Sequence, residues 1–318
     1  MRNALDFSRM ADMDYLKRPH TLRLDASRML DHARSVVCLA LPYRAAEPSS
    51  IPPDDNQSCG RISSYAWGKD YHGILSSRLR KIEAFIQDLN LSERVHTRSC
   101  VDSTPLMERA YATRAGVGFP GKNTTIISPG YGSWIVLGEI ITTLALEPDS
   151  PVEERCGTCG LCLVTCPTGA LRAPYILDAR LCIAYHTIEN RKGIIPDGVK
   201  EKMSTRLFGC DSCQSVCPLN KEAVRPAESP LTMRTDIHNR WLNLAKVLSI
   251  RSDEEFRRTF HDSPLARPGR IGLMRNAAIV AGNLGSHALR PLLEKLRSSD
   301  DYQEPALRDA IDYALARM

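Results

Sequence analysis

Cysteines are crowded into one stretch of this chain, between residues 156 and 220. The first group, at residues 156–167, has the spacing C-x-x-C-x-x-C-x-x-x-C-P. Thiolates at this spacing hold cubane iron–sulfur clusters, with three ligands on one cluster and the fourth on a second. One intact run therefore predicts a second set of cysteine ligands further along the chain.

The second set lies at residues 210–218, where the spacing C-x-x-C-x-x-x-C-P repeats the back half of the first run. Leu207 stands where the first cysteine of a full run would be, and the isolated Cys182 is the simplest replacement for it. With the crossed ligation of two-cluster ferredoxins, we assign one 4Fe-4S cluster to Cys156, Cys159, Cys162 and Cys217, and the other to Cys166, Cys182, Cys210 and Cys213.

A pair of structural zinc sites is the alternative, because C-x-x-C also suits tetrahedral zinc. The run of closely spaced cysteines with a terminal Cys-Pro has no rationale in tetrahedral coordination, however, and matches the iron–sulfur pattern throughout. Disulfides are disfavoured, since cysteines at this density serve metal binding in reduced compartments. We therefore expect a cytoplasmic protein. The amino terminus lacks the apolar stretch of a signal peptide, and no apolar run is long enough to span a membrane.

The formal net charge is +5, from 42 Lys and Arg against 37 Asp and Glu. Cysteine counts as neutral in that charge, whereas two thiolate-ligated clusters are negative and bring the total close to zero. Net charge therefore neither indicates nor excludes a nucleic-acid partner, and only a local basic patch could do so.

Strands and helices alternate before the cysteine stretch. Short apolar runs bounded by turn residues predict strands at 35–41, 95–101, 124–128 and 134–144. Apolar residues at helical spacing predict a helix over 71–89, and Pro105 suits the first turn of another that continues to about residue 115. Residues 1–34 have a helical pattern, whereas the proline-rich segment 44–62 predicts an irregular loop.

This alternation predicts an α/β (α+β) domain over residues 1–149. A ferredoxin-like module with two 4Fe-4S clusters should follow at 150–224. Residues 225–318 should form a connector and a short HEAT-like tail, because three helical patterns follow one another there. A tail of so few repeats cannot form a solenoid alone, and we expect it to pack on the body of the protein.

Two further motifs are weaker. Residues 116–123 match G-x-G-x-x-G and nearly match a phosphate-binding loop. Pro120 has no amide to offer a phosphate, so a glycine-rich turn that supports a site is the better interpretation. Asp70-Tyr71-His72 begins like the D-x-H-x-x-G sequence of cobalt-binding corrinoid proteins, but Leu75 replaces the glycine. We therefore favour His72 as a polar residue near a helix start.

Several of these stretches together resemble the epoxyqueuosine reductase family. They are residues 66–72, 101–110, 115–123, 131–134 and the two cysteine groups, which occur in the family's order and spacing from about Arg23 onward. The resemblance implies a cobalamin-dependent, iron–sulfur oxidoreductase that reduces the epoxide of epoxyqueuosine in the tRNA anticodon, the last step of queuosine biosynthesis. Family members usually carry a further strand and helix before this point, so we expect a shortened amino-terminal subdomain.

The resemblance also implies roles for single residues. Asp102 would be the general acid that protonates the departing epoxide oxygen, although position alone marks it only as a helix-start residue. To donate a proton at neutral pH, Asp102 needs a raised pKa, which burial against an apolar cofactor face would provide. The positions that match the family's cobalamin-binding residues are Arg23, Ser63, Asp102, Ile126, Leu137, Ala184, Cys210 and Asp211. Glu189 lies in a segment that is also similar to the family's.

The implied partners are a tRNA that carries epoxyqueuosine and an external low-potential electron donor, with no membrane, and we expect a monomer. Candidate basic residues for tRNA contact are Lys17, Arg18, Arg191, Lys192, Arg267, Arg270 and Arg275. Two alternatives stay open. One is a reductive dehalogenase-like corrinoid enzyme, which would normally carry the export signal that is not seen here. The other is an electron-transfer or corrinoid-activating protein that has no RNA substrate.

Overall fold

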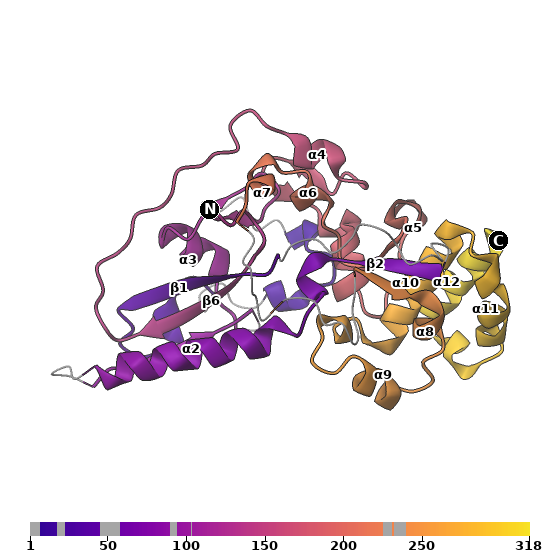
Figure 1. Ribbon diagram of the computed structural model, residues 1–318, viewed down its shortest axis with the longest axis horizontal. Coiled ribbons are helices and arrows are strands. Elements are labelled where there is room, and N and C mark those ends of the chain that lie inside the picture. Colours follow the sequence, from indigo (N-terminus) through magenta and orange to yellow (C-terminus); the bar gives the residue numbers. More distant parts are fainter. Residues whose placement is uncertain are drawn as a thin grey trace.

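The computed structural model describes residues 7–17, 23–44, 58–89, 94–102, 104–224, 231 and 240–318. One end of the molecule is built on a sheet of β1 (Ser35–Pro42), β6 (Ile135–Thr142) and β3 (Thr97–Cys100), in the order β1-β6-β3. Helices from the last third of the chain form the other end (Figure 1). The short elements of the cysteine-rich segment lie between these two parts.

The first sheet carries apolar side chains on both faces, and a helix covers each face. Val37 and its partner Ile140 pack with α2 (Tyr71–Asp88), while Leu137 on the opposite face packs with α3 (Glu108–Arg114). Every strand pair in this sheet is antiparallel, which is the α+β form of the predicted domain. The predicted strand at 35–41 and helix at 71–89 are confirmed.

Local details differ from the sequence-based predictions. The helix predicted from Pro105 begins at Glu108, because the amide of Met107 bonds to the carbonyl of Arg23 and holds the preceding residues in a turn. The strand predicted at 124–128 shortens to β5 (Ile126–Ile127), paired with β4 (Phe119–Pro120). In the described part of residues 1–34, the helical pattern forms the short 3-10 turns η2 (Phe7–Arg9), η3 (Asp14–Lys17) and η4 (Ala26–Arg28).

A second sheet joins distant parts of the chain. Its middle strand β2 (Cys59–Ile62) runs antiparallel to β10 (Trp241–Asn243) and parallel to β9 (Arg206–Phe208). Gly60 permits this pairing, because a Cβ there would lie 2.6 Å from the Cβ of Leu207. The irregular loop predicted at 44–62 is therefore wrong for its last four residues, and 45–57 lie outside the described residues. The predicted domain boundaries stay predictions, although this sheet draws one strand from each predicted domain.

The cysteine-rich segment contains only short elements. They are α4 (Leu161–Thr165), β7 (Leu171–Ala173), β8 (Ile176–Leu177), the 3-10 turn η7 (Ala179–Leu181), the π-helical turn η8 (Tyr185–Glu189), α5 (Asp197–Met203), α6 (Ser212–Ser215) and α7 (Pro218–Lys221). The helices α4, α6 and α7 lie side by side (Figure 1), and α4 contacts α6. This contact brings the two cysteine groups together.

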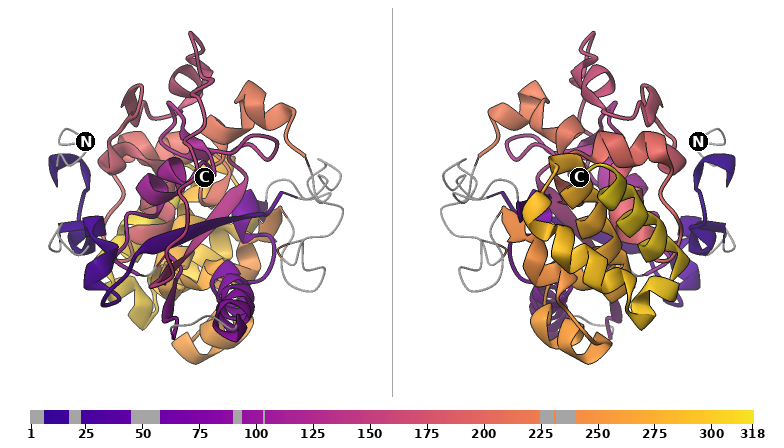
Figure 2. Two further views of the ribbon diagram at one scale, coloured as in Figure 1. Left: turned by 90° about the vertical axis from the view of Figure 1, so that its left-hand side faces the viewer. Right: turned by 90° about the vertical axis from the view of Figure 1, so that its right-hand side faces the viewer.

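The last third of the chain forms helices, as predicted: α8 (Leu244–Leu248), α9 (Asp253–Thr259), α10 (Gly269–Leu284), α11 (Arg290–Arg297) and α12 (Pro305–Ala316). Figure 2 shows the yellow helices of this region stacked across one end of the molecule. Gly282 lets α10 approach α12, because a Cβ there would lie 2.7 Å from the Cα of Ala314. The tail packs on the body as expected.

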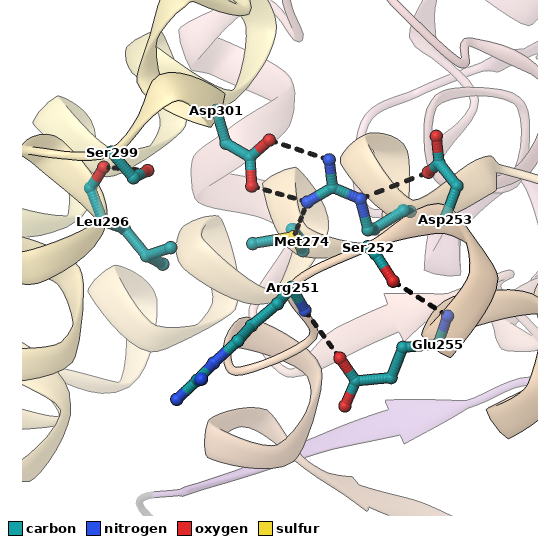
Figure 3. A network of polar contacts seen from close by, with 9 residues as sticks. Arg251, Ser252, Asp253, Glu255, Met274, Leu296, Ser299 and Asp301 are labelled. Atoms are coloured by element: carbon teal, nitrogen blue, oxygen red, sulfur yellow. Dashed lines mark hydrogen bonds and ion pairs between the residues drawn. The ribbon is translucent and has the colours of Figure 1, made fainter.

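The amino end of α10 is fixed by Arg270. Its Nη2 donates to Asp301 at 2.7 Å, and its Nε donates to Asp253 at 3.2 Å. Figure 3 shows the carboxylates of Asp301 and Asp253 converging from two different segments. Arg270 is therefore engaged in structural ion pairs, and only 10% of its side chain is exposed. Its expected role in tRNA contact is wrong for this reason.

Arg275, in the middle of α10, has no exposed surface. Its guanidinium donates to the carbonyl oxygens of His186 at 2.6 Å, Asn190 at 2.6 Å and Gly193 at 2.8 Å. The neighbouring Asn276 donates from its amide to the carbonyls of Thr187 and Leu207. Burial lowers the pKa of Arg275 to about 10, which leaves it charged at neutral pH. Its expected contact with tRNA is therefore also wrong, because α10 needs this charge inside the core.

We predict that Arg275→Met destabilises the protein. Methionine fills a similar volume but leaves three buried carbonyl oxygens without a donor, and the loss should be roughly 3 kcal/mol of the free energy of unfolding. Thermal denaturation followed by circular dichroism should give a midpoint lower by roughly 5–10 °C. The exposed Arg308→Met on α12 is the matched control and should leave the midpoint unchanged. Equal midpoints for both variants would contradict this role.

Candidate functional site

Four cysteines of the first predicted ligand set line one cavity of about 130 Å³: Cys156, Cys159, Cys162 and Cys217. The same cavity is lined by Lys122, whose ammonium group donates to the carbonyl oxygens of Gly157 and, at 2.9 Å, of Cys159. The glycine-rich segment before Lys122 therefore packs against the cysteine loop. This contact agrees with the interpretation of that segment as a turn that supports a site.

The second predicted ligand set also converges. Burial raises the pKa of the Cys213 thiol well above its usual range, and the nearby thiols of Cys210, Cys182 and Cys166 raise it further. The pKa of Cys182 is raised by burial too, with added contributions from Cys210 and Cys166. A thiol acts on another in this way only at short range. The isolated Cys182 therefore lies close to the second cysteine group, whose sequence pattern is one ligand short.

Neither thiol group is arranged around a single ion. Among the residues that the structure describes, no three Cys, His, Asp or Glu side chains come close enough to hold one metal ion. Tetrahedral zinc draws its ligands to about 2.0–2.3 Å from one centre, whereas a cubane cluster is held by four thiolates at its corners. Four thiols that line one cavity suit the corners of a cubane cluster.

A larger cavity, of about 440 Å³, lies beside the second thiol group. It is lined by Cys182 and by three carboxylates, those of Asp102, Glu108 and Glu189. Of the sequence-predicted cofactor contacts, the structure brings four to this cavity: Asp102, Ile126, Leu137 and Ala184. The remaining wall includes four tyrosines, Tyr43, Tyr65, Tyr71 and Tyr185.

Three other predicted contacts line a neighbouring cavity of about 310 Å³: Ser63, Cys210 and Asp211. The buried carboxylate of Asp211 accepts hydrogen bonds from the Ser63 hydroxyl and from the amide of Ser64 at 2.8 Å. Gly209 has φ +69°, and a Cβ there would lie 2.4 Å from the Cβ of Ser63, so this turn requires glycine. Both cavities border the second thiol group, since Cys182 lines one and Cys210 lines the other.

Arg23 is the one predicted cofactor contact that lines neither of these cavities. Its Nη1 donates to the carbonyl oxygen of Tyr15 at 3.5 Å, and its Nε is buried without a hydrogen-bond partner. Burial raises the pKa of Glu108, and the Arg23 guanidinium is close enough to oppose that rise. An unsatisfied buried donor of this kind leaves Arg23 able to bind an acceptor that is not part of the chain.

Asp102, which lines the larger cavity, forms a hydrogen-bonded pair with His72. The Nε2 atom of His72 lies 3.2 Å from Oδ2 of Asp102, and its Nδ1 lies 2.6 Å from Oδ1 of Asp70. Asp102 has φ +31°, a strained conformation for a residue other than glycine. Sequence analysis left His72 without a partner, and the only signal for it was the partial D-x-H pattern.

The expected rise in the pKa of Asp102 is wrong in this structure. The hydrogen bond with His72 lowers the pKa of Asp102 and outweighs the opposing effect of burial. In turn, the hydrogen bonds to Asp102 and Asp70 raise the pKa of His72 to about 9. At neutral pH the shared proton therefore lies on His72, and Asp102 is a carboxylate.

The last third of the chain also reaches this site. Arg267, which follows the 3-10 turn η9 (Pro264–Ala266), holds Glu189 in a two-pronged pair, with Nε to Oε1 at 3.1 Å and Nη2 to Oε2 at 3.3 Å. Its charge also lowers the pKa of Asp102. Of the other basic residues proposed for tRNA contact, Arg191 and Lys192 are exposed, while Lys17 has an undescribed side chain and Arg18 lies outside the described residues.

Comparison with known proteins identifies relatives of both halves of this site. A family model described as a 4Fe-4S double cluster binding domain matches residues 155–220. Another, described as epoxyqueuosine reductase QueG, DUF1730, matches residues 23–103. An epoxyqueuosine reductase from Synechocystis is 40% identical over 218 residues, which is 69% of this chain and 73% of the relative. The Escherichia coli epoxyqueuosine reductase is 34% identical over 98% of this chain and 80% of its own length.

Solved structures match over most of the chain. An epoxyqueuosine reductase crystallised with an epoxyqueuosine-modified tRNA-Tyr stem loop superposes with a TM-score of 0.86 at 34% identity, covering 94% of this chain and 77% of that one. A Bacillus subtilis epoxyqueuosine reductase, described with its aspartate catalytic loop swung out of the active site, gives 0.85 at 34% identity over 94% and 77% of the two chains. In the described part of this chain, no helix is long and apolar enough to cross a membrane.

Proposed function

This chain belongs to the epoxyqueuosine reductase family, and we propose that it reduces the epoxide of epoxyqueuosine in the tRNA anticodon to queuosine with cobalamin as its cofactor. The observation that carries this proposal is a single cavity lined both by Asp102, the candidate acid, and by Cys182, a candidate cluster ligand. Reductive opening of an epoxide needs electrons and protons at one place. This cavity is where the two groups meet.

The overall reaction removes one oxygen atom from the cyclopentane ring. Two electrons and two protons are consumed, both carbon–oxygen bonds of the epoxide break, a carbon–carbon double bond forms, and the oxygen leaves as water. The chain's own task is to bind the modified nucleotide, to bring electrons to the cavity and to supply protons to the oxygen.

We assign the two clusters as the cysteine spacing predicts. Cys156, Cys159, Cys162 and Cys217 hold one, and Cys166, Cys182, Cys210 and Cys213 hold the other. The support for this assignment is the four-thiol cavity at the first set and the mutual influence of the thiols at the second. The second set borders both larger cavities, so it is the one that hands electrons to the site.

The residues around these cavities fit cobalamin. Ile126 and Leu137 offer aliphatic surface to a corrin face, and Ala184 leaves space in the wall beside them. Ser63 and Asp211, which line the cavity of about 310 Å³, offer polar groups to the amides around a corrin. We assign the binding to Arg23, Ser63, Asp102, Ile126, Leu137, Ala184, Cys210 and Asp211, with the unsatisfied Nε of Arg23 as its donor. When bound, cobalamin supplies low-potential two-electron reduction, which clusters that transfer single electrons cannot provide alone.

Asp102 is the proposed proton donor to the epoxide oxygen. It lines the cavity from the strained turn after β3, so its carboxyl group can face a substrate there. Transfer of a proton as the carbon–oxygen bond breaks avoids formation of a free alkoxide. The relative whose aspartate catalytic loop swings out of its active site agrees with such a role for a loop residue.

The wider setting follows from the same chemistry. The protein acts as a monomer in the cytoplasm, with an external low-potential electron donor that recharges the clusters. The exposed Arg191 and Lys192 follow η8 at the edge of the site and are the best placed of the proposed basic residues for tRNA phosphates. The HEAT-like tail supports η8 through α10, and the boundaries at residues 149 and 224 separate the cofactor, cluster and helical parts.

The proposed activity is tested by nucleoside mass spectrometry. Epoxyqueuosine-containing tRNA is incubated without oxygen with the reconstituted protein, cobalamin and a strong reductant, and a parallel sample omits cobalamin. We expect loss of one oxygen from the modified nucleoside only with cobalamin. An unchanged nucleoside, with clusters intact and cobalamin bound, would instead favour another corrinoid reduction or an electron carrier.

Asp102→Asn should keep the absorbance of the clusters and of bound cobalamin but lose turnover. Asparagine preserves the shape of the side chain and cannot give up a proton, so the single-turnover rate should fall by about 10²–10⁴-fold. The exposed Asp88→Asn at the end of α2 is the matched control and should turn over like the unmodified protein. Full activity of Asp102→Asn would remove Asp102 as the acid.

Cys182→Ala should reduce the iron content from about eight to about four atoms per chain, because one 4Fe-4S cluster loses a ligand. Iron and sulfide analysis of the protein reconstituted without oxygen measures this directly. Cys38→Ala removes a thiol of β1 that belongs to neither set and should leave the iron content unchanged. Eight irons per chain in Cys182→Ala would show that another residue replaces the ligand missing at Leu207.

A further inference from the structure

His72 is held between two carboxylates where α2 begins. Asp70 caps the helix by accepting from the amide of His72 at 2.9 Å, and the same Oδ1 atom lies 2.6 Å from the ring Nδ1. The other ring nitrogen faces Asp102 at 3.2 Å. A ring with a carboxylate at each nitrogen donates from both nitrogens only as an imidazolium. Asp70 thus anchors a charged ring whose free end reaches Asp102.

The orientation of the ring is fixed by packing. Tyr71 stacks on His72, with ring centroids 4.1 Å apart and an angle of 25° between the ring planes. Tyr71 also lies close enough to Asp102 to add to the lowering of its pKa by His72. The side chain of His72 remains 34% exposed, so its proton can exchange with solvent. The His72 ring is therefore held in contact with Asp102, and its exposed side can take up a proton from solvent.

The charged groups around the pair favour a proton at this place. On α2, Asp70 faces the ring, and from α3, Glu108 lies within electrostatic reach of both His72 and Asp102. Glu189 of η8 is held by Arg267, the cation that acts on Asp102 from the carboxy-terminal part. Arg23 and Tyr15 act from the amino-terminal segment. From β6, Glu139 also lies within electrostatic reach of Asp102, and burial raises the pKa of Glu139 to about 8. The two carboxylates in direct contact with the ring dominate, because the other groups act at longer range.

A carboxylate cannot donate a proton, yet the proposed reaction takes protons from Asp102. The geometry points to His72 as the proton store of this site: its imidazolium passes a proton to Asp102, which delivers it to the epoxide oxygen. This inference rests on the proposed function. His72 does not touch the substrate; it is a positioning residue that acts through Asp102.

The step balances with the groups present. The Nε2–H bond of His72 breaks as an O–H bond forms on Asp102, and that proton then moves to the oxygen as a carbon–oxygen bond of the epoxide breaks. The electrons come from the reduced cofactor of the proposed reaction. The departing oxygen takes two protons in all, so His72 is recharged from solvent between them. Asp102 ends as the carboxylate with which it began.

A purely structural role for His72 would be to hold the strained turn of Asp102. His72→Gln separates the two roles, because glutamine can still donate a hydrogen bond to Asp102 but cannot carry an exchangeable charge. If His72 stores the proton, single-turnover rates of the holoenzyme at pH 7.5 should fall about 10–100-fold, with little change in KM for the tRNA.

The pH profile gives the sharper readout. In the unmodified protein the pair keeps its proton until the pH exceeds about 9, so the rate should be level through neutral pH and fall above that value. In His72→Gln, Asp102 must hold the proton alone and loses it in the acidic range. The rate should then fall about tenfold per pH unit through neutral pH. The rate of each variant is divided by the rate of the unmodified protein at the same pH. This ratio removes the pH dependence of the electron supply, because both proteins share it.

Two further variants complete the rate measurements. The exposed His96→Gln, at the start of β3, should match the unmodified profile. Asp70→Asn removes one of the two carboxylates that stabilise the imidazolium of His72. The fall of the rate at alkaline pH should therefore begin about one pH unit lower than in the unmodified protein. Asp70→Asn also carries the test if His72→Gln fails to retain its iron.

A readout independent of activity is the reaction of the histidine rings with diethyl pyrocarbonate, which attacks only neutral imidazole. Peptide mass spectrometry of the holoenzyme should place the midpoint for His72 near pH 9, above the usual range of a free imidazole. An ordinary midpoint for His72, or parallel pH profiles of His72→Gln and an active unmodified enzyme, would overturn the proton store. An inactive unmodified holoenzyme would overturn the proposed function itself.

Discussion

The buried guanidinium of Arg275 sets the position of the segment on which the site is built. It gathers the carbonyls of His186, Asn190 and Gly193 around one charge, and Asn276 adds those of Thr187 and Leu207. Charged donors form strong hydrogen bonds in a low-dielectric interior, and a buried charge left unpaired is unfavourable. These carbonyls therefore have little freedom to move. Cys182 and the cavity wall at Ala184, Ile188 and Glu189 lie in or beside the same segment, so a helix from the last third of the chain fixes the site.

Sequence reasoning succeeds wherever the partners of a residue are close in the chain. The strand at 35–41 and the helix at 71–89 follow from their own apolar spacing, whereas the division of the eight cysteines between two clusters stays a prediction. It fails where the partner is distant. β2 forms at the end of a proline-rich loop because β9 and β10, far along the chain, provide its hydrogen bonds. Arg275 looks like a surface cation until the carbonyls that enclose it are known.

The candidate acid illustrates the same limit. Family resemblance identifies Asp102, but the charge state of Asp102 depends on His72, which comes from another element and makes contact only through the tertiary fold. The expectation of a raised pKa considered burial alone. In the structure the opposite effect wins, because a hydrogen-bonded cation 3.2 Å away stabilises the carboxylate more than partial burial destabilises it. The proposed acid is therefore a pair of residues, and neither is interpretable without the other.

In the proposed reaction, electrons and protons approach the cavity from different elements. The thiols of the second set come from the cysteine-rich segment around η8, whereas the His72–Asp102 pair comes from α2 and the turn after β3. A low-potential reductant reduces protons if they reach it directly, which wastes electrons. Separating the residue that stores the proton from the residues that hold the reductant avoids this loss. The substrate's oxygen can then be the place where the two supplies meet. An aspartate that receives its proton through a hydrogen bond with His72 fits this constraint, because it carries one proton at a time to one position.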